Sequence, residues 1–152
     1  MSIVVKKYLA DLESKLINNK RKNLIELTRS WAKTFPNKAG VYVLFEGNNL
    51  VYVGETQSIK ERMNDLLDTR HHTVRRKIGL FNFFSTEGFK LANSKIKHPV
   101  HIENLVCKWI KSKNKMSYLE VELGRKELEE YLVIKYSPKY NSSGRRGRSV
   151  PG

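Results

Sequence analysis

The stretch GVYVLFEGNNLVYVGE, residues 40–55, decides the fold of this chain. Its two halves are rich in Val, Tyr, Phe and Leu, and Gly47-Asn48-Asn49 lies between them. Two runs of this composition around a Gly/Asn-rich centre are typical of a β-hairpin. The sequence therefore predicts two antiparallel strands joined by a short turn.

Tyr42 and Tyr52 can act together only if they lie on one face of this hairpin. Side chains alternate between the faces of a strand, so the numbers of paired residues must then have an even sum. A three-residue connection pairs Glu46 with Leu50 and gives this parity, whereas a two-residue connection places the tyrosines on opposite faces. We therefore expect an odd-length connection, with positive φ at Gly47 or Asn49. The opposite face should be apolar and consist of Val41, Val43, Phe45, Val51 and Val53.

The rest of the chain is mostly helical by its hydrophobic spacing. Helices are predicted over about 6–34, with a break at Asn18-Asn19, and over 58–68, 73–81 and 125–136. Residues 97–114 are ambiguous, and residues 116–123 form a third candidate strand. The predicted fold is α+β, with a small, mainly antiparallel three-stranded sheet flanked by helices.

The charge of the chain points to a polyanionic partner. Among 152 residues, 29 Lys and Arg face 15 Asp and Glu, which gives a net charge of +14. Such a field favours nucleic acid. The single cysteine, Cys107, excludes an intramolecular disulfide and a multi-cysteine zinc site, and the composition suits a reducing, cytoplasmic compartment. No membrane span is expected, and the N-terminus does not read as a signal peptide.

Gly40-Val41-Tyr42 followed by Tyr52-Val53-Gly54 resembles the double motif of the GIY-YIG nuclease family. Arg62 stands eight residues after Gly54, where the family keeps a catalytic arginine. Glu129 begins EEYLVIKYSPKYN, which is similar to the family's metal-ligand helix, and Asn141 ends that stretch like the asparagine that closes the family's core. The resemblance implies one domain with a helical extension (1–37), a GIY-YIG-like core (38–141) and a mobile basic tail (142–152).

The chain departs from the family pattern at two positions. Leu66 stands where many members carry His or Tyr, four residues after Arg62, and we expect His72, or failing that His71, to replace that side chain. Glu55 follows the second motif, where some members place a lysine that helps to lower a tyrosine pKa. A carboxylate cannot do that by charge.

Hydrolysis of a phosphodiester needs a nucleophilic water and charge stabilisation at the phosphate. We expect Tyr42, assisted by Tyr52, to be the general base or water-orienting group, and Arg62 to bind a phosphate oxygen. Glu129 can hold Mg²⁺ (or Mn²⁺) together with waters and a substrate phosphate. Each residue also has an alternative explanation. The tyrosines can be read as ordinary strand residues and Arg62 as a solvated helix arginine. Glu129 can be read as a glutamate in the first turn of a helix, where the helix dipole favours a negative charge.

Nucleic acid should lie along the basic segments. Seven lysines and one acid, Glu103, fall between residues 89 and 115, and His98 and His101 within it read as surface residues. Cys107 reads as buried and inert. Asn141 either fixes local backbone or touches a phosphate. The candidate nucleic-acid contacts are Gly54, Arg70, His71, Arg75, Arg76, Lys77 and Asn141.

The function that these residues favour is a divalent-metal-dependent endonuclease acting on DNA, most simply the double-stranded form. One alternative is a catalytically inactive nucleic-acid-binding module with the same fold, which Leu66 and Glu55 favour. Another is an interaction module that works through the N-terminal helices and needs no metal. The sequence leaves open whether the chain is a monomer or a homodimer.

Overall fold

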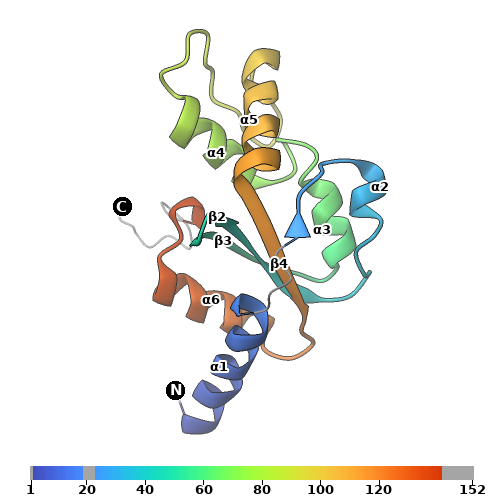
Figure 1. The fold of residues 1–152 in the computed structure, drawn as a ribbon, viewed down its shortest axis with the longest axis vertical. Coiled ribbons are helices and arrows are strands. Elements are labelled where there is room, and N and C mark those ends of the chain that lie inside the picture. The colour runs from blue at the N-terminus through green and yellow to red at the C-terminus, as the bar shows by residue number, and fades with distance from the viewer. Residues whose placement is uncertain (1, 19–22, 142–152) are drawn as a thin grey trace.

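The structure, a computed structural model, describes residues 2–18 and 23–141. Figure 1 shows a central sheet with helices on both sides. Among the described residues, none of the helices combines the length and the apolar character that a membrane span requires. The elements follow in the order α1 (Ile3–Ile17), β1 (Asn23–Leu24), α2 (Arg29–Ala32), β2 (Gly40–Glu46), β3 (Asn49–Thr56), α3 (Ile59–Asp65), α4 (Thr73–Phe83), α5 (Val100–Lys113), β4 (Asn114–Glu120), α6 (Arg125–Tyr136) and the 3₁₀ helix η1 (Lys139–Asn141).

The sheet is antiparallel throughout, in the order β1-β4-β2-β3. This confirms the predicted α+β class, but the sheet has four strands and not three. The additional strand, β1, is two residues long and pairs with β4. Two residues are too few to show the alternation of apolar and polar side chains by which a strand is predicted.

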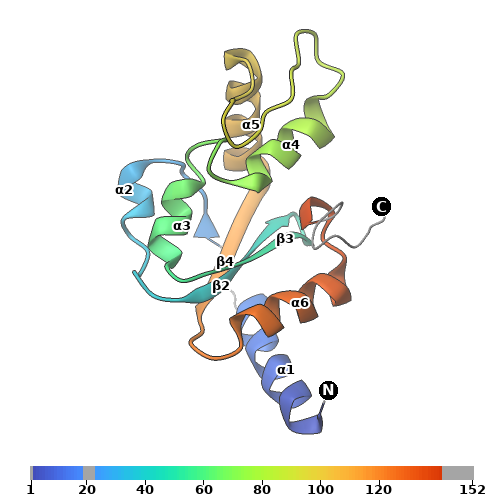
Figure 2. The same ribbon diagram turned by 180° about the vertical axis from the view of Figure 1, so that it is seen from behind.

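The sheet separates two hydrophobic clusters. On one face, α1 and α6 pack on the sheet through residues that include Leu9, Leu16 and Leu132. On the other face, α2 to α5 enclose Tyr42, Tyr52 and the apolar side chains around them. Figure 2 shows α6 and α1 on one side of the strands and α3 and α4 on the other. The tyrosine face is therefore the one on which a site can form.

The β2–β3 hairpin reaches the expected parity by a different route. Glu46 pairs with Asn49, so the turn has two residues and the predicted three-residue connection is wrong. Gly47 has φ +60°, which confirms one of the two predicted positions and suits a type II′ turn. The register then shifts between Phe45 and Leu44, because a β-bulge inserts one extra residue into β3.

The bulge returns the two tyrosines to one face. Beyond it, Leu44 pairs with Tyr52 and Tyr42 with Gly54, so the sums of paired numbers are even. The rings of Tyr42 and Tyr52 lie with centroids 6.0 Å apart. Val51 is turned into the cluster on the tyrosine face, which contradicts its predicted place on the opposite face.

The N-terminal region contains one long helix instead of two. The helix α1 confirms the first half of the predicted 6–34 region, but the second half forms β1 and the four-residue α2. Thr28 caps α2 by accepting a hydrogen bond from the backbone N–H of Trp31, and Leu27 has φ +56°. Ile25 is buried from irregular backbone and Trp31 from the short α2, so their apolar spacing was misread as one continuous helix.

Other boundaries differ by smaller amounts. The ambiguous 97–114 segment is largely α5, the predicted strand at 116–123 begins and ends earlier as β4, and α6 coincides with its prediction. The predicted mobile tail, residues 142–152, lies outside the described residues, as does Asn19 of the predicted helix break. The division into extension, core and tail stays a prediction.

Asn141 closes the open edge of β3. Its side chain is buried, its Oδ1 accepts a hydrogen bond from the N–H of Val53 at 2.8 Å, and its Nδ2 donates to the carbonyl of Val53 at 2.8 Å. Since β3 is an edge strand, these bonds replace the ladder partner that an edge lacks. The structure therefore shows the backbone role that the sequence left open for Asn141, and its contact with nucleic acid stays a prediction.

We predict that Asn141→Ala lowers the free energy of unfolding by about 2–3 kcal/mol, because it leaves two buried backbone groups of Val53 without partners. Urea denaturation followed by circular dichroism measures this loss. Asn48→Ala, at an exposed turn position, is the control and should change stability by less than about 0.5 kcal/mol. Equal stability of Asn141→Ala and the wild type would contradict the edge-closing role.

Candidate active site

The hydroxyl of Tyr42 is the point at which the predicted catalytic residues meet. Tyr42 projects from β2 and is fully buried. Its Oη lies 2.7 Å from Nε2 of His72, and Nε of Arg62 donates to it at 3.3 Å. The His72 ring lies 5.5 Å from that of Tyr52. Strands β2 and β3, helix α3 and the start of α4 thus contribute one residue each.

His72 has one possible tautomer in this position. It caps α4, and its Nδ1 accepts a hydrogen bond from the backbone N–H of Val74 at 3.1 Å. Because a backbone N–H can only donate, Nδ1 carries no proton and the neutral ring carries it on Nε2. The Nε2–H therefore donates to the Tyr42 hydroxyl. Burial, and then the positive charge of Arg62, hold the pKa of His72 well below its ordinary value, so the ring is neutral at pH 7.

The tyrosines are tuned in opposite directions by burial and by Arg62. Burial raises the pKa of Tyr42 well above 10, and that of Tyr52 above 10, whereas the guanidinium of Arg62 lowers the pKa of both. Arg62 donates a hydrogen bond to the Tyr42 hydroxyl, and the two tyrosine rings lie with centroids 6.0 Å apart. The phenolate thus has a cation beside it, but the isolated site keeps both tyrosines protonated at neutral pH.

Arg62 is held from two sides while it faces the tyrosines. Its Nη1 donates to Oδ2 of Asp65 at 3.1 Å and to the carbonyl of His71 at 3.0 Å. Burial opposes its charge, but Tyr42 and Tyr52 keep its pKa above the ordinary value. Arg62 is therefore a fixed cation in the site, as its spacing from Gly54 suggested, and not a freely solvated helix arginine.

Glu129 lies on α6, half-buried, and its negative charge raises the pKa of Tyr52. Its carboxylate is therefore within electrostatic reach of the tyrosines. Within residues 2–18 and 23–141, no group of three or more His, Cys, Asp or Glu side chains is arranged to hold a metal ion. A single carboxylate fits Mg²⁺, which keeps several waters and takes substrate phosphate oxygens as ligands.

Gly54 makes room for Tyr42 in the hairpin, and its contact with nucleic acid stays a prediction. It is buried directly opposite Tyr42 in the hairpin. A Cβ at this position would lie 2.4 Å from Cζ of the Tyr42 ring, which is closer than real Cβ contacts come. The glycine of the second motif therefore makes room for the tyrosine of the first.

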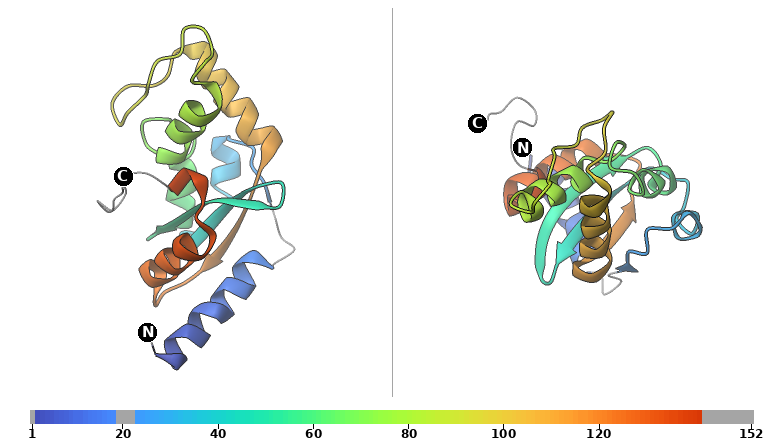
Figure 3. Two further views of the ribbon diagram at one scale, coloured as in Figure 1. Left: turned by 90° about the vertical axis from the view of Figure 1, so that its left-hand side faces the viewer. Right: turned by 90° about the horizontal axis from the view of Figure 1, so that it is seen from above.

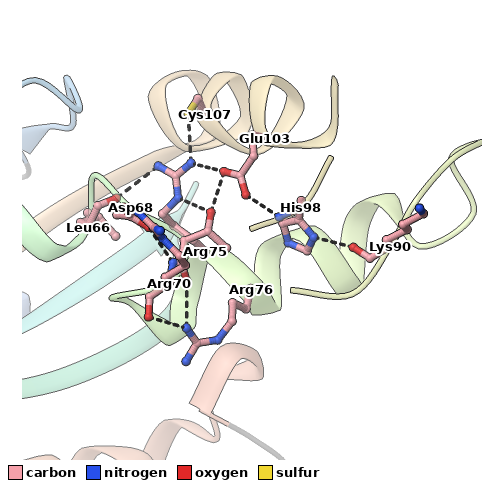
Figure 4. Close-up of polar contacts among 10 residues, drawn as sticks. Leu66, Asp68, Arg70, Arg75, Arg76, Lys90, His98, Glu103 and Cys107 are labelled. Carbon is pink, nitrogen blue, oxygen red and sulfur yellow. Dashed lines mark hydrogen bonds and ion pairs between the residues drawn. The ribbon is translucent and has the colours of Figure 1, made fainter. Parts of the chain in front are cut away.

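Arg75 is buried in a network of polar contacts, and its contact with nucleic acid stays a prediction. Its side chain is 3% exposed, and its Nη2 pairs with Oε1 of Glu103 at 2.8 Å. The guanidinium also donates to Thr69 Oγ1 at 2.9 Å and to the carbonyl of Leu66 at 3.2 Å, as Figure 4 shows. Leu66 itself is fully buried as an apolar side chain. The polar contact with the Tyr42 hydroxyl comes from His72 instead.

Arg76, the next residue, has a different environment. Its Nη1 donates to the carbonyls of Thr69 at 2.8 Å and Arg70 at 3.1 Å, and its Nη2 donates to Thr73 Oγ1 at 3.2 Å. These three acceptors are uncharged, and burial and the charge of Arg62 lower the pKa of Arg76. The guanidinium groups of Arg62 and Arg76 therefore repel one another electrostatically. None of the three acceptors of Arg76 named above is a carboxylate that would offset this repulsion.

The other basic candidates lie at the surface to different degrees. His71 is exposed, Lys77 is half-buried, and Arg70 pairs with Asp68 at 2.7 Å. Arg70 donates to both carboxylate oxygens of Asp68. These hydrogen bonds are the main reason why the pKa of Asp68 lies well below its ordinary value. Nucleic-acid contacts by these three residues stay predictions.

Two side interpretations of the sequence need correction, those of His98 and Cys107, and Glu55 gains a partner. His98 is buried and not a surface residue: its Nδ1 donates to the carbonyl of Lys90 at 2.9 Å. Cys107 is half-buried and lies 3.2 Å from Nη2 of Arg75. Glu55 pairs with Arg125 at 2.7 Å, which explains a carboxylate at that position. The one acid of the lysine-rich segment, Glu103, was the sequence signal that could have revealed the buried Arg75 network.

Comparison with known proteins adds a family to this geometry. The family model described as the GIY-YIG catalytic domain matches residues 27–149. The GIY-YIG N-terminal endonuclease domain of UvrC from Thermotoga maritima, as a point mutant bound to a divalent cation, is 17% identical, with a TM-score of 0.41 over 76% of this chain and 94% of that one. The same domain bound to magnesium is 18% identical, with a TM-score of 0.40 over 75% and 94%. Among curated protein sequences, none matches.

The neutral, buried state of His72 predicts how stability depends on pH. In the unfolded chain His72 binds a proton below about pH 6.5, whereas the folded state holds the neutral ring, so stability is complete above that pH and is lost below it. The limiting slope is about 1.4 kcal/mol per pH unit. His72→Asn keeps a side-chain acceptor for the Val74 N–H and removes the titration.

Chemical denaturation between pH 5 and 7 checks this prediction. We expect the difference in unfolding free energy between wild type and His72→Asn to shrink as the pH falls. A difference that stays constant across this range would show that His72 titrates in the folded state as it does in the unfolded chain.

Proposed function

Because the chain belongs to the GIY-YIG catalytic domain family, we propose that it is a divalent-metal-dependent endonuclease that hydrolyses the phosphodiester bonds of double-stranded DNA. Membership confirms the family inferred from the hairpin motifs and, with it, the endonuclease class. The observation that carries the proposal is the Tyr42 hydroxyl, which receives N–H donors from His72 and Arg62. The negative charge of Glu129 on α6 acts on Tyr52, which supports Glu129 as the one carboxylate of the site.

The two tyrosines act as one acid–base unit. Their ring centroids lie 6.0 Å apart and the charge of Arg62 lowers the pKa of both, so loss of one proton is shared between them in this proposal. His72 fixes the direction of the unit, because its Nε2–H can only donate to Tyr42. In the proposed reaction this pair takes the proton of the attacking water and holds that water in position.

Arg62 and Arg76 bind the phosphate that is cleaved. Arg62 is oriented by Asp65 and the carbonyl of His71, and Arg76 by the carbonyls that precede α4. Two close guanidinium groups repel one another, and a dianionic or monoanionic phosphate between them relieves that repulsion. The pair therefore stabilises the charge that develops on the phosphate oxygens.

Glu129 would hold the metal ion. Its half-buried carboxylate near Tyr52 suits a cation, and a Mg²⁺ or Mn²⁺ ion bound there supplies positive charge that stabilises the phosphate and favours a phenolate. The raised pKa values of the tyrosines in the protein alone indicate that such a charge is needed before the pair can act as a base at neutral pH.

The inactive-module alternative loses the two features that favoured it. The side chain missing at Leu66 is supplied by His72, which contacts Tyr42 from the start of α4. The carboxylate at Glu55 is neutralised by Arg125 and faces that residue of α6. Both departures from the family pattern thus have a structural explanation that leaves the tyrosine site complete, which supports the enzyme.

We predict that Glu129→Gln and Arg62→Gln each lower Mg²⁺-dependent cleavage of a supercoiled plasmid by at least about 100-fold, because one removes the metal ligand and the other a phosphate donor. Gel assays of nicked and linear products measure the rate. Glu130→Gln, at the exposed neighbouring position of α6, is the matched control and should cleave like the wild type.

EDTA should abolish cleavage by the wild type. Two results would contradict the proposal: cleavage that persists in EDTA, or DNA binding without any cleavage that is the same in the wild type and both variants. The second result would favour the non-catalytic module.

A further inference from the structure

Helices α4 and α5 and the loop 84–99 between them form a lobe that projects from the tyrosine face of the sheet. In Figures 1 and 2 this lobe occupies one end of the molecule and α1 the other. Figure 3 shows the same separation from the side. We propose that loop 84–99 is a rigid DNA-binding arm that grips the duplex beside the cleaved bond, an inference that rests on the proposed endonuclease function.

The surface of the loop combines positive charge with exposed apolar side chains. Lys90, Lys95 and Lys97 are exposed, and Glu87 is the one acid among residues 84–99. Leu91 is 65% and Ile96 60% exposed, although side chains of this kind are usually buried. Lysines around exposed apolar groups suit a duplex, whose phosphates attract the cations and whose groove can receive the apolar side chains.

The loop is built to keep its shape. Oδ1 of Asn93 accepts hydrogen bonds from the N–H groups of Lys95 at 2.8 Å and Ile96 at 2.9 Å, and the N–H of Asn93 donates to the carbonyl of Ile96 at 2.9 Å. These bonds fold the loop into a tight turn with Leu91 and Ile96 on either side of it. An ordered loop loses little conformational entropy on binding.

The base of the loop is tied to both helices through Glu103 (Figure 4). Oε2 of Glu103 accepts the N–H of His98 at 2.8 Å, and its Oε1 accepts from Arg75 at 2.8 Å. His98 in turn donates to the carbonyl of Lys90. The buried ion pair between Arg75 and Glu103 therefore has a structural role. It fixes the base of the loop that carries the exposed lysines.

The position of the lobe sets where it meets the DNA. Helix α4 begins at the cap His72, which contacts Tyr42, and its 11 residues end at the loop. An α-helix of this length is about 16 Å long. The arm should therefore contact the duplex to one side of the cleaved bond and not at the bond itself.

We predict that the triple substitution Lys90→Gln, Lys95→Gln, Lys97→Gln weakens binding of a 30-base-pair duplex about 10- to 100-fold at low salt, and lowers the slope of log affinity against log salt by about 2–3. Binding is measured by fluorescence anisotropy in EDTA, so that the duplex stays intact. The charge-matched control is Lys6→Gln, Lys7→Gln, Lys15→Gln, on exposed positions of α1 at the opposite end of the molecule. It should keep the wild-type slope.

The apolar part of the arm is tested separately. Leu91→Ser with Ile96→Ser should weaken binding about 10-fold and leave the salt slope unchanged, since no charge is removed. Wild-type affinity of this double variant overturns the apolar contact. Equal losses in the two lysine triples, or no loss in either, overturn the arm.

Plasmid cleavage by the wild type in Mg²⁺ tests the endonuclease function separately from the DNA-binding arm. If the wild type cleaves while the loop triple binds DNA normally, the arm fails and the endonuclease function stands. If the wild type neither binds nor cleaves DNA, both fail. Wild-type binding to vesicles of anionic lipid without binding to the duplex would assign the basic, apolar loop to a membrane surface and would also overturn the arm.

Discussion

The hydrogen bond between the Tyr42 hydroxyl and Nε2 of His72 is the interaction on which the site depends. It joins the first strand of the hairpin to the start of α4, and Arg62 of α3 donates to the same oxygen. Its direction follows from a local contact at the cap of α4, because the Val74 N–H occupies Nδ1 and leaves the proton on Nε2. A helix cap thus decides how the Tyr42 phenol is held, and Gly54 leaves the space in which that phenol lies.

The positive charge of the chain is divided between three uses. Arg75 is buried inside the lobe, where its ion pair with Glu103 fixes the base of loop 84–99. Arg62 and Arg76 stand at the tyrosine site, held by Asp65 and by uncharged acceptors respectively, and are suited to phosphate. The lysines of loop 84–99 lie at the surface, where they can act only on a large polyanion. Adjacent basic residues in the sequence therefore differ in role because successive helix positions point about 100° apart.

Much of the fold could be predicted from the sequence because its signals are local. The spacing of apolar residues placed α6, and alternation with a Gly/Asn turn placed the hairpin. The parity of the two tyrosines was also foreseen, but the bulge that produces it was not, since a register shift depends on pairing between strands. The ion pair of Arg75 was missed for a similar reason, because its partner Glu103 is distant in the sequence. The backbone role of Asn141 was one of two alternatives, and only the pairing of its side chain with the edge of β3 decides for it. Spacing from the motif led to Arg62 and the departure at Leu66 led to His72, and the structure places both side chains at the Tyr42 hydroxyl. Their roles in catalysis stay predictions.

The most direct measurement of the central claim is ¹⁵N NMR of the His72 ring between pH 5 and 8. The account predicts a neutral ring with the proton on Nε2 across this range, with a scalar or through-space connection from that proton to the Tyr42 hydroxyl. Tyr42→Phe should shift the Nε2–H resonance without changing the tautomer, because the Val74 N–H still occupies Nδ1. A proton on Nδ1, or a titration of His72 near pH 6.5, would contradict the account, since His72 could then not act as the fixed donor to Tyr42.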